Sequence, residues 1–335
     1  MKVLLLAILL LSFGALSVAQ KIYSEKINGA NFVSPKYQSK LDGIDSLKSI
    51  NANWIALCPF AILENNSRSI VFNSTKNWWG DTKIGLIEAI KRARANKLTV
   101  MIKPHFWIKN KGWAGNFDLS GKLKMEWEKN YKDYLLLLAN LSDSLDIEML
   151  CIGTELKTYT TNHPEFFIDL IEEIRKVYKG KLTYAANWDE YKLVNFWDKL
   201  NYISIDAYFP LSDKKTPKIT ELELEWKKIT KDLKNFSLKL GKKIIFTEYG
   251  YRSINYSANK QWEFEKTPNT EQINFMAQIN AYAAFYNTIW KEQFIAGGFL
   301  WKWYNDYNLD KNNSDYTPQQ KPVQQLIKTQ YAKKL

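Results

Sequence analysis

The chain has 335 residues, of which 46% are hydrophobic, 15% aromatic and 24% charged, with only 14 glycines and 9 prolines. This composition excludes disordered, collagen-like and low-complexity proteins. Its 47 basic and 35 acidic residues give a net charge of +12, but the lysines are scattered and accompany no nucleic-acid-binding motif, so we expect no nucleic-acid partner. Two histidines and two cysteines are too few for a His/Cys zinc site, and we expect neither a metal nor an organic cofactor.

The first residues have the features of a secretory signal peptide. Met1-Lys2 is a short positive region, Val3 to Leu11 is an almost unbroken apolar run, and Ser17-Val18-Ala19 is a small-x-small cleavage site. The apolar run is shorter than the roughly 20 residues that span a bilayer. We therefore predict a signal peptide over residues 1–19 and a mature domain over residues 20–335. The expected product is a secreted or periplasmic monomer without stable membrane insertion.

Eight apolar runs follow, and most are separated by a segment with helical periodicity. They are Ile27–Val33, Asn53–Phe60, Leu98–Trp107, Ile147–Leu156, Lys181–Trp188, Tyr202–Pro210, Lys243–Tyr251 and Ala296–Tyr304. Continuous hydrophobicity is typical of strands buried on both faces of a parallel sheet. Cys58 and Cys151 lie in the second and fourth runs. If one strand separates them, two spacings of ~4.8 Å place them too far apart for a disulfide, and we predict two buried free thiols.

The segments between the runs predict amphipathic helices. The first begins at Asp81 or Thr82 and ends near Asn96, and others cover residues 123–141, 164–178, 222–240 and 270–289. Gly241 is expected to stop the helix that precedes it. The tail from residue 312 is predicted to be a polar extension with a last helix near residues 322–331, and the sequence assigns it no function.

Eight strands alternating with helices fit an α/β fold of the (β/α)8 TIM barrel type in a single domain. A doubly wound sheet would usually contain a glycine-rich phosphate loop, which this sequence lacks. The chemistry of such barrels lies at the C-terminal ends of the strands. The polar and aromatic residues at those ends are Lys103, His105, Trp107, Glu155, Asn187, Trp188, Asp206, Tyr208, Glu248 and Trp301.

Glu155 and Glu248 each close a strongly apolar strand, where an ionised carboxylate is costly unless it faces a polar cleft. Two carboxyl groups are the minimum for cleaving a glycosidic bond: one protonates the departing oxygen, and the other attacks the anomeric carbon or activates water. The alternative is that each Glu pairs with a Lys or Arg at the rim. Two Glu residues at matching strand ends, surrounded by aromatic residues, favour the catalytic interpretation.

The chain contains 13 tryptophans, more than a core of this size requires. Indole and phenol rings stack on the apolar faces of sugars, so an aromatic cleft with polar groups suits a glycan. Trp127 and Trp290 lie on helical stripes and are predicted to be core residues. Trp107 and Trp301 are predicted to be sugar platforms, and Trp79 either lines the mouth or pins the loop after the second strand.

Four motifs occur in order across nearly the whole mature chain. They are Val100–His105 before a Trp-rich loop, Ile152-Gly153-Thr154-Glu155-Leu156, Thr247-Glu248-Tyr249-Gly250 and Gly298-Phe299-Leu300-Trp301. Together they resemble glycoside hydrolase family 113, the β-mannanases of the clan A barrels. Many clan A enzymes have Asn immediately before the acid/base, whereas this chain has Thr154, and the family it resembles also has Gly-Thr-Glu.

The resemblance implies retaining hydrolysis of β-1,4-mannosidic bonds in mannan, glucomannan or manno-oligosaccharides. It assigns Glu155 as the general acid/base, Glu248 as the nucleophile and Tyr208 as a hydrogen-bond donor to the nucleophile. The substrate-binding candidates are Lys103, His105, Trp107, Trp79, Asn187, Trp188, Asp206 and Trp301. Two alternatives stay open: the same machinery acting on another β-linked glycan such as a β-glucan, or a barrel that binds carbohydrate without catalysis.

Overall fold

The computed structural model describes residues 26–63, 70–108, 113–263 and 272–333. The predicted signal peptide lies outside these ranges. Eight parallel strands close a barrel in the order β1, β11, β10, β9, β8, β7, β5, β2. Their bounds are β1 Ile27–Val33, β2 Trp54–Leu57, β5 Thr99–Ile102, β7 Met149–Thr154, β8 Lys181–Asn187, β9 Ile203–Asp206, β10 Ile244–Tyr249 and β11 Ile295–Tyr304. The single-domain (β/α)8 barrel predicted from the sequence is confirmed.

Two of the predicted strands each divide in two at a proline. The second run gives β2 and then β3 (Phe60–Leu63), and the third gives β5 and then β6 (His105–Ile108). Pro59 and Pro104 stand between the halves, and because proline has no N–H to donate, it interrupts a ladder there. The outer halves form a separate small sheet with β4 (Ile70–Val71), in the order β4, β3, β6, above the barrel strands that they continue.

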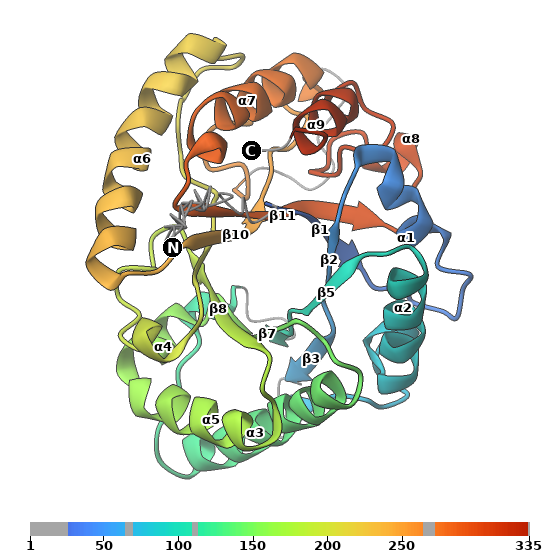
Figure 1. Ribbon diagram of the computed structural model, residues 1–335, viewed down its shortest axis with the longest axis vertical. Coiled ribbons are helices and arrows are strands. Elements are labelled where there is room, and N and C mark those ends of the chain that lie inside the picture. The colour runs from blue at the N-terminus through green and yellow to red at the C-terminus, as the bar shows by residue number, and fades with distance from the viewer. Residues whose placement is uncertain (1–25, 64–69, 109–112, 264–271, 334–335) are drawn as a thin grey trace, which may run out of the picture.

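Helices surround the strands (Figure 1). They are α1 Asp42–Ser46, α2 Lys83–Ala95, α3 Gly121–Ser144, α4 Lys157–Asn162, α5 Pro164–Val177, α6 Ile219–Leu240, α7 Phe275–Asn287, α8 Leu309–Asn312 and α9 Val323–Tyr331. Thr82 caps α2 by accepting from the Gly85 N–H, as predicted. Gly241 ends α6 at a φ of 62°, a left-handed conformation that glycine adopts without steric cost. Residues 270–271, where the predicted α7 begins, lie outside the described residues.

The last helix predicted in the tail is confirmed as α9, but the expectation that the tail is a polar extension was wrong. Helix α9 packs beside α7 (Figure 1) and buries Val323, Ile327 and Tyr331 against the barrel. The Tyr331 hydroxyl donates to the Gly29 carbonyl of β1 at 2.8 Å. These side chains recur every four residues, which is the spacing of one helix face. Helix α9 thus completes the helical ring after the eighth barrel strand.

Side chains fill the inside of the barrel and include Met101, Met149, Ile245 and Phe299. Cys58 and Cys151 are buried free cysteines, as predicted. A larger apolar core lies between the strands and the helices and contains the fully buried Trp127 and Trp290. The described part of the chain contains no helix with the length and apolar character needed to cross a membrane.

Candidate active site

The two predicted carboxyl groups meet at the C-terminal end of the barrel. Glu155 follows β7, and Glu248 lies within β10. Glu155 has a φ of 51°, and its N–H donates to the Ala185 carbonyl of β8 at 2.8 Å, which holds this turn against the neighbouring strand. Both residues line one cavity of about 590 Å³. A cavity of this size lies within the range of ligand-binding clefts.

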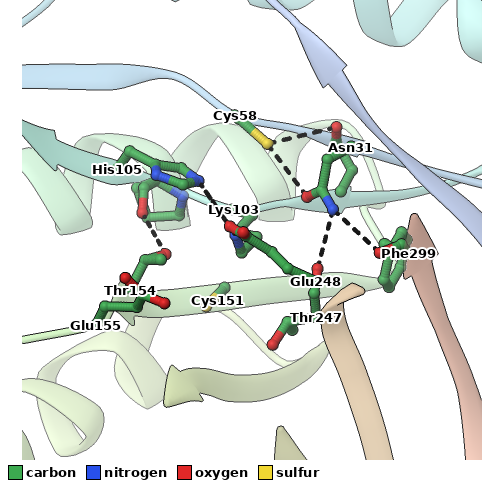
Figure 2. A network of polar contacts seen from close by, with 12 residues as sticks. Asn31, Cys58, Lys103, His105, Cys151, Thr154, Glu155, Thr247, Glu248 and Phe299 are labelled. Carbon is green, nitrogen blue, oxygen red and sulfur yellow. Dashed lines mark hydrogen bonds and ion pairs between the residues drawn. The ribbon is translucent and has the colours of Figure 1, made fainter. Parts of the chain in front are cut away.

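Glu248 is held by donors on both carboxylate oxygens, and one of these donors, Lys103, is drawn beside it in Figure 2. The Lys103 ammonium donates to Oε1, and the Tyr208 hydroxyl donates to Oε2 at 2.6 Å. Asn31 of β1 donates from its side chain to the Thr247 carbonyl at 3.0 Å, which fixes the strand beside Glu248. Hydrogen bonds and a cation that favour the charged form stabilise a carboxylate. These contacts therefore fix the position of the Glu248 side chain at the cavity.

Lys103 is fully buried, with an exposed fraction of 0%. Burial opposes its charge, but the carboxylates of Asp206 and Glu248 outweigh burial and raise the pKa of Lys103 above its usual value. Lys103 Nζ lies 3.1 Å from His105 Nε2. Burial and the neighbouring Lys103 charge hold the pKa of His105 well below its usual value, so His105 is neutral. Since the ammonium can only donate, we infer that Nε2 accepts and that Nδ1 carries the imidazole proton.

Glu155 has a different environment. The Trp113 indole N–H donates to its Oε2 at 2.6 Å. Loss of water around the half-buried carboxyl, together with the charge of Glu248, raises the pKa of Glu155 to about 8. A carboxyl group with this pKa is mostly protonated at neutral pH. The two glutamates thus differ as an acid and a nucleophile must.

Aromatic side chains form much of the cavity wall. They are Phe106, Trp107, Trp113, Trp188, Tyr208, Trp262, Trp301 and Tyr316. The Trp188 and Trp262 rings are 6.3 Å apart on one side, and Trp301 lies 5.7 Å from the His105 ring. Trp107 is 50% exposed, which leaves a wide ring available to a ligand. Rings with polar neighbours such as Asn187 can hold both the faces and the hydroxyls of sugars.

The structure brings seven of the predicted site residues to this cavity with Glu155. They are His105, Trp107, Asn187, Trp188, Tyr208, Glu248 and Trp301. It corrects the expectation for Lys103 and Asp206, because both are fully buried and cannot touch a bound sugar. Of the two alternatives for Trp79, the structure contradicts a place at the mouth: its backbone N–H donates to the Lys36 carbonyl at 3.0 Å, and its side chain lines a separate hollow with Tyr37 and Trp78.

The sequence analysis missed four aromatic wall residues: Phe106, Trp113, Trp262 and Tyr316. Trp113 was visible as one of the aromatic residues after the third strand, and its contact with Glu155 could have been suspected. Tyr316 belongs to the tail and gave no such signal. In the described ranges, no group of three or more His, Cys, Asp or Glu side chains is arranged to hold a metal ion.

A TIM barrel whose strand ends place two carboxyl groups in one aromatic cleft has the architecture of a glycoside hydrolase of the two-carboxylate class. The family model of Glycoside Hydrolase Family 113 matches residues 30–321. The chain therefore belongs to glycoside hydrolase family 113, as the motifs suggested, and is an enzyme of that class. No curated protein sequence matches the chain significantly.

Solved structures share the fold. A GH113 β-1,4-mannanase complex is 23% identical, with a TM-score of 0.78 over 92% of this chain and 99% of its own. The GH113 β-mannanase AaManA from Alicyclobacillus acidocaldarius, solved with ManMIm, is 20% identical, with a TM-score of 0.81 over 93% and 99%. A β-glucuronidase from Ruminococcus gnavus is 11% identical, with a TM-score of 0.62 over 92% of this chain and 50% of its own.

Proposed function

We propose that this enzyme hydrolyses β-1,4-mannosidic bonds in mannan, glucomannan or manno-oligosaccharides with retention of configuration. The observation that carries the mechanism is the opposite treatment of the two glutamates: Glu248 receives donors on both oxygens, whereas the pKa of Glu155 is raised to about 8. The substrate is supported by family membership and by the fold that this chain shares with GH113 β-mannanases.

In the first step, Glu155 protonates the glycosidic oxygen while Glu248 attacks the anomeric carbon from the opposite face. The leaving sugar departs, and the glycone stays bonded to Glu248 as an ester. Tyr208 and Lys103 hold the attacking carboxylate in place. Trp301 lines the same cavity and offers a flat ring for the glycone.

In the second step, Glu155 acts as a base. The charge of Glu248 is one cause of the raised pKa of Glu155, and that charge disappears when Glu248 forms the ester. The pKa of Glu155 therefore falls at the moment when a carboxylate is needed to deprotonate water. The water attacks the anomeric carbon, and the second inversion restores the β configuration.

The proposed substrate predicts reducing-sugar release from mannan and glucomannan by the purified mature protein. The control panel is barley β-glucan, xylan and cellulose, because mannose and glucose differ only in the 2-hydroxyl and one hydrogen bond can discriminate between them. Activity on the glucans alone would replace the substrate and keep the mechanism. NMR identifies the anomer of the product that is released first, and initial release of the α-anomer would contradict retention.

Trp113→Phe should move the alkaline limb of kcat/KM to higher pH. Wild-type activity should fall as pH rises through about 8, because Glu155 must be protonated in the free enzyme. The Trp113 hydrogen bond favours the ionised form of Glu155, so its loss should raise this limit by up to about one pH unit, given about 1 kcal/mol per net hydrogen bond. Trp107→Phe, which changes another wall of the cavity, is the matched control. An unmoved limb would show that Trp113 does not tune the acid.

A further inference from the structure

The segment of residues 313–321, here called the C-terminal strap, runs between α8 and α9 and carries one residue into the active site. Tyr316 lines the cavity with Glu155 and Glu248. Its ring is 5.8 Å from the ring of Tyr208 at an interplanar angle of 66°, and Tyr208 is the residue that donates to Glu248. Tyr316 therefore lies in the same cavity wall as Tyr208, close to Glu248.

The strap is fixed to the loop that follows β10. Lys321 is only 3% exposed, and its Nζ donates to the Ser253 hydroxyl at 2.9 Å and to the Asp315 carbonyl at 2.6 Å. The Ser253 hydroxyl in turn donates to the Asn313 carbonyl. The buried Arg252 guanidinium donates to the Ser314 carbonyl at 3.1 Å. Three consecutive residues before Tyr316 are thus held through their carbonyls.

The strap is also fixed to the end of β11. The Asp315 carboxylate accepts from the Tyr304 hydroxyl and lies 3.3 Å from Lys302 Nζ, and it accepts from the Tyr316 N–H at 2.7 Å. Gln319 bonds the Tyr304 backbone in both directions, at 2.7 and 3.1 Å. These contacts connect the strap to β11, the strand that carries Trp301. Trp301 and Tyr316 therefore reach the same cavity from two segments that are bonded to each other.

We propose that Tyr316 is a substrate-binding residue that contacts the sugar at the point of attack, and that Lys321 is the positioning residue that holds it there. The proposal rests on the proposed function, because it requires a glycan in this cavity. A buried amino group is costly unless its hydrogen bonds are made, and Lys321 Nζ makes them to Ser253 in the loop after β10 and to the Asp315 carbonyl in the strap. Removing Lys321 releases the backbone on which Tyr316 is mounted.

Kinetics on the substrate that the wild-type enzyme cleaves best in the polysaccharide panel test the proposal. Tyr316→Phe keeps the ring against Tyr208 and removes the hydroxyl, and we expect a loss of about 5- to 10-fold in kcat/KM. Tyr316→Ala should lose about 100-fold. Lys321→Met should lose at least 10-fold in the wild-type background but less than 3-fold when Tyr316 is already Ala, because the two residues act through one contact. Lys328→Met, an exposed lysine on α9, should change nothing.

Independent, multiplying losses for Lys321→Met and Tyr316→Ala would overturn the positioning role, and unchanged kinetics in both Tyr316 variants would overturn the substrate contact. If Lys321→Met does not fold, Ser253→Ala removes the bridge to the strap at lower cost and enters the same cycle. If the wild-type enzyme cleaves no polysaccharide or oligosaccharide, the proposed function fails and the strap proposal falls with it. If the wild type is active but the strap variants do not behave as expected, the strap proposal fails and the proposed function is unaffected.

Discussion

Glu248→Ala should abolish hydrolysis of mannan and of an activated aryl β-mannoside, with a loss on the order of 10⁴-fold or more, the scale on which removal of a nucleophile acts in other covalent enzymes. Both carboxylate oxygens that Lys103 and Tyr208 hold in place are lost, and no neighbouring group replaces the bond to the anomeric carbon. Initial rates on both substrates, measured beside the wild type, give the loss.

The fold must be checked in the same experiment, because this change leaves Lys103 buried without its closest partner. Breaking a buried ion pair can cost about 3–5 kcal/mol of stability. Asp206 also supports the Lys103 charge, which should keep the variant folded with a lower melting temperature. Glu248→Gln is the matched control: it retains an oxygen for Lys103, should melt closer to the wild type, and should be equally inactive. Retained activity in the Gln variant would remove Glu248 from the nucleophile role.

Azide gives the Glu248→Ala experiment a chemical signature. The small anion can enter the space left by the carboxylate and attack an activated aryl β-mannoside from the face that Glu248 occupied. A single displacement inverts the anomeric carbon, so the product should be the α-mannosyl azide. A β-mannosyl azide from this variant would reverse the assignment of the two glutamates.

The barrel could be predicted because its strands are buried on both faces and read as eight apolar runs, a pattern that needs no knowledge of distant contacts. The small sheet of β3, β4 and β6 could not, because Pro104 marks a break in the run Leu98–Trp107 but nothing local shows that the second half pairs with β3. The tail was underestimated for another reason. Its buried stripe of Val323, Ile327 and Tyr331 is short, and the polar residues around it dominate the composition.

The candidate site was predictable where the strand itself fixes a residue's position. Glu155, Tyr208 and Glu248 follow directly from the ends of β7, β9 and β10. Lys103 also stands at a strand end, yet its side chain is buried under Glu248 because a carboxylate from another strand attracts it inward. That partner comes from 145 residues further along the chain, and no local pattern reveals it.

The positions of loop residues also depend on partners that are distant in sequence. Trp79 is drawn away from the cavity by backbone hydrogen bonds between its segment and residues 35–36. Trp113 and Tyr316 reach the cavity through contacts with Glu155 and with the strap's anchors, respectively. Each of these positions depends on contacts between residues that are distant in sequence. The sequence therefore shows the residue types but not where their side chains lie in the fold.

Glu155→Ala should slow hydrolysis of mannan by about 10²- to 10⁴-fold, the usual contribution of a positioned general acid or base. The first step with a good leaving group, such as dinitrophenolate, needs no proton and should proceed nearly as in the wild type. The second step still needs a base, so the glycosyl-enzyme should accumulate and give a burst of released phenol. Stopped-flow absorbance measures the burst, and intact-protein mass measures the ester on Glu248.

Azide should also rescue Glu155→Ala, but with the opposite stereochemistry. Here it attacks the glycosyl-enzyme from the face that water uses, needs no base, and yields the β-mannosyl azide after two inversions. Glu155→Gln should show the same burst while keeping the volume beside Trp113, which separates loss of the proton from loss of packing. Equal slowing with good and poor leaving groups would contradict the acid role of Glu155. An α-mannosyl azide from Glu248→Ala together with a β-mannosyl azide from Glu155→Ala would assign Glu248 as the nucleophile and Glu155 as the acid/base.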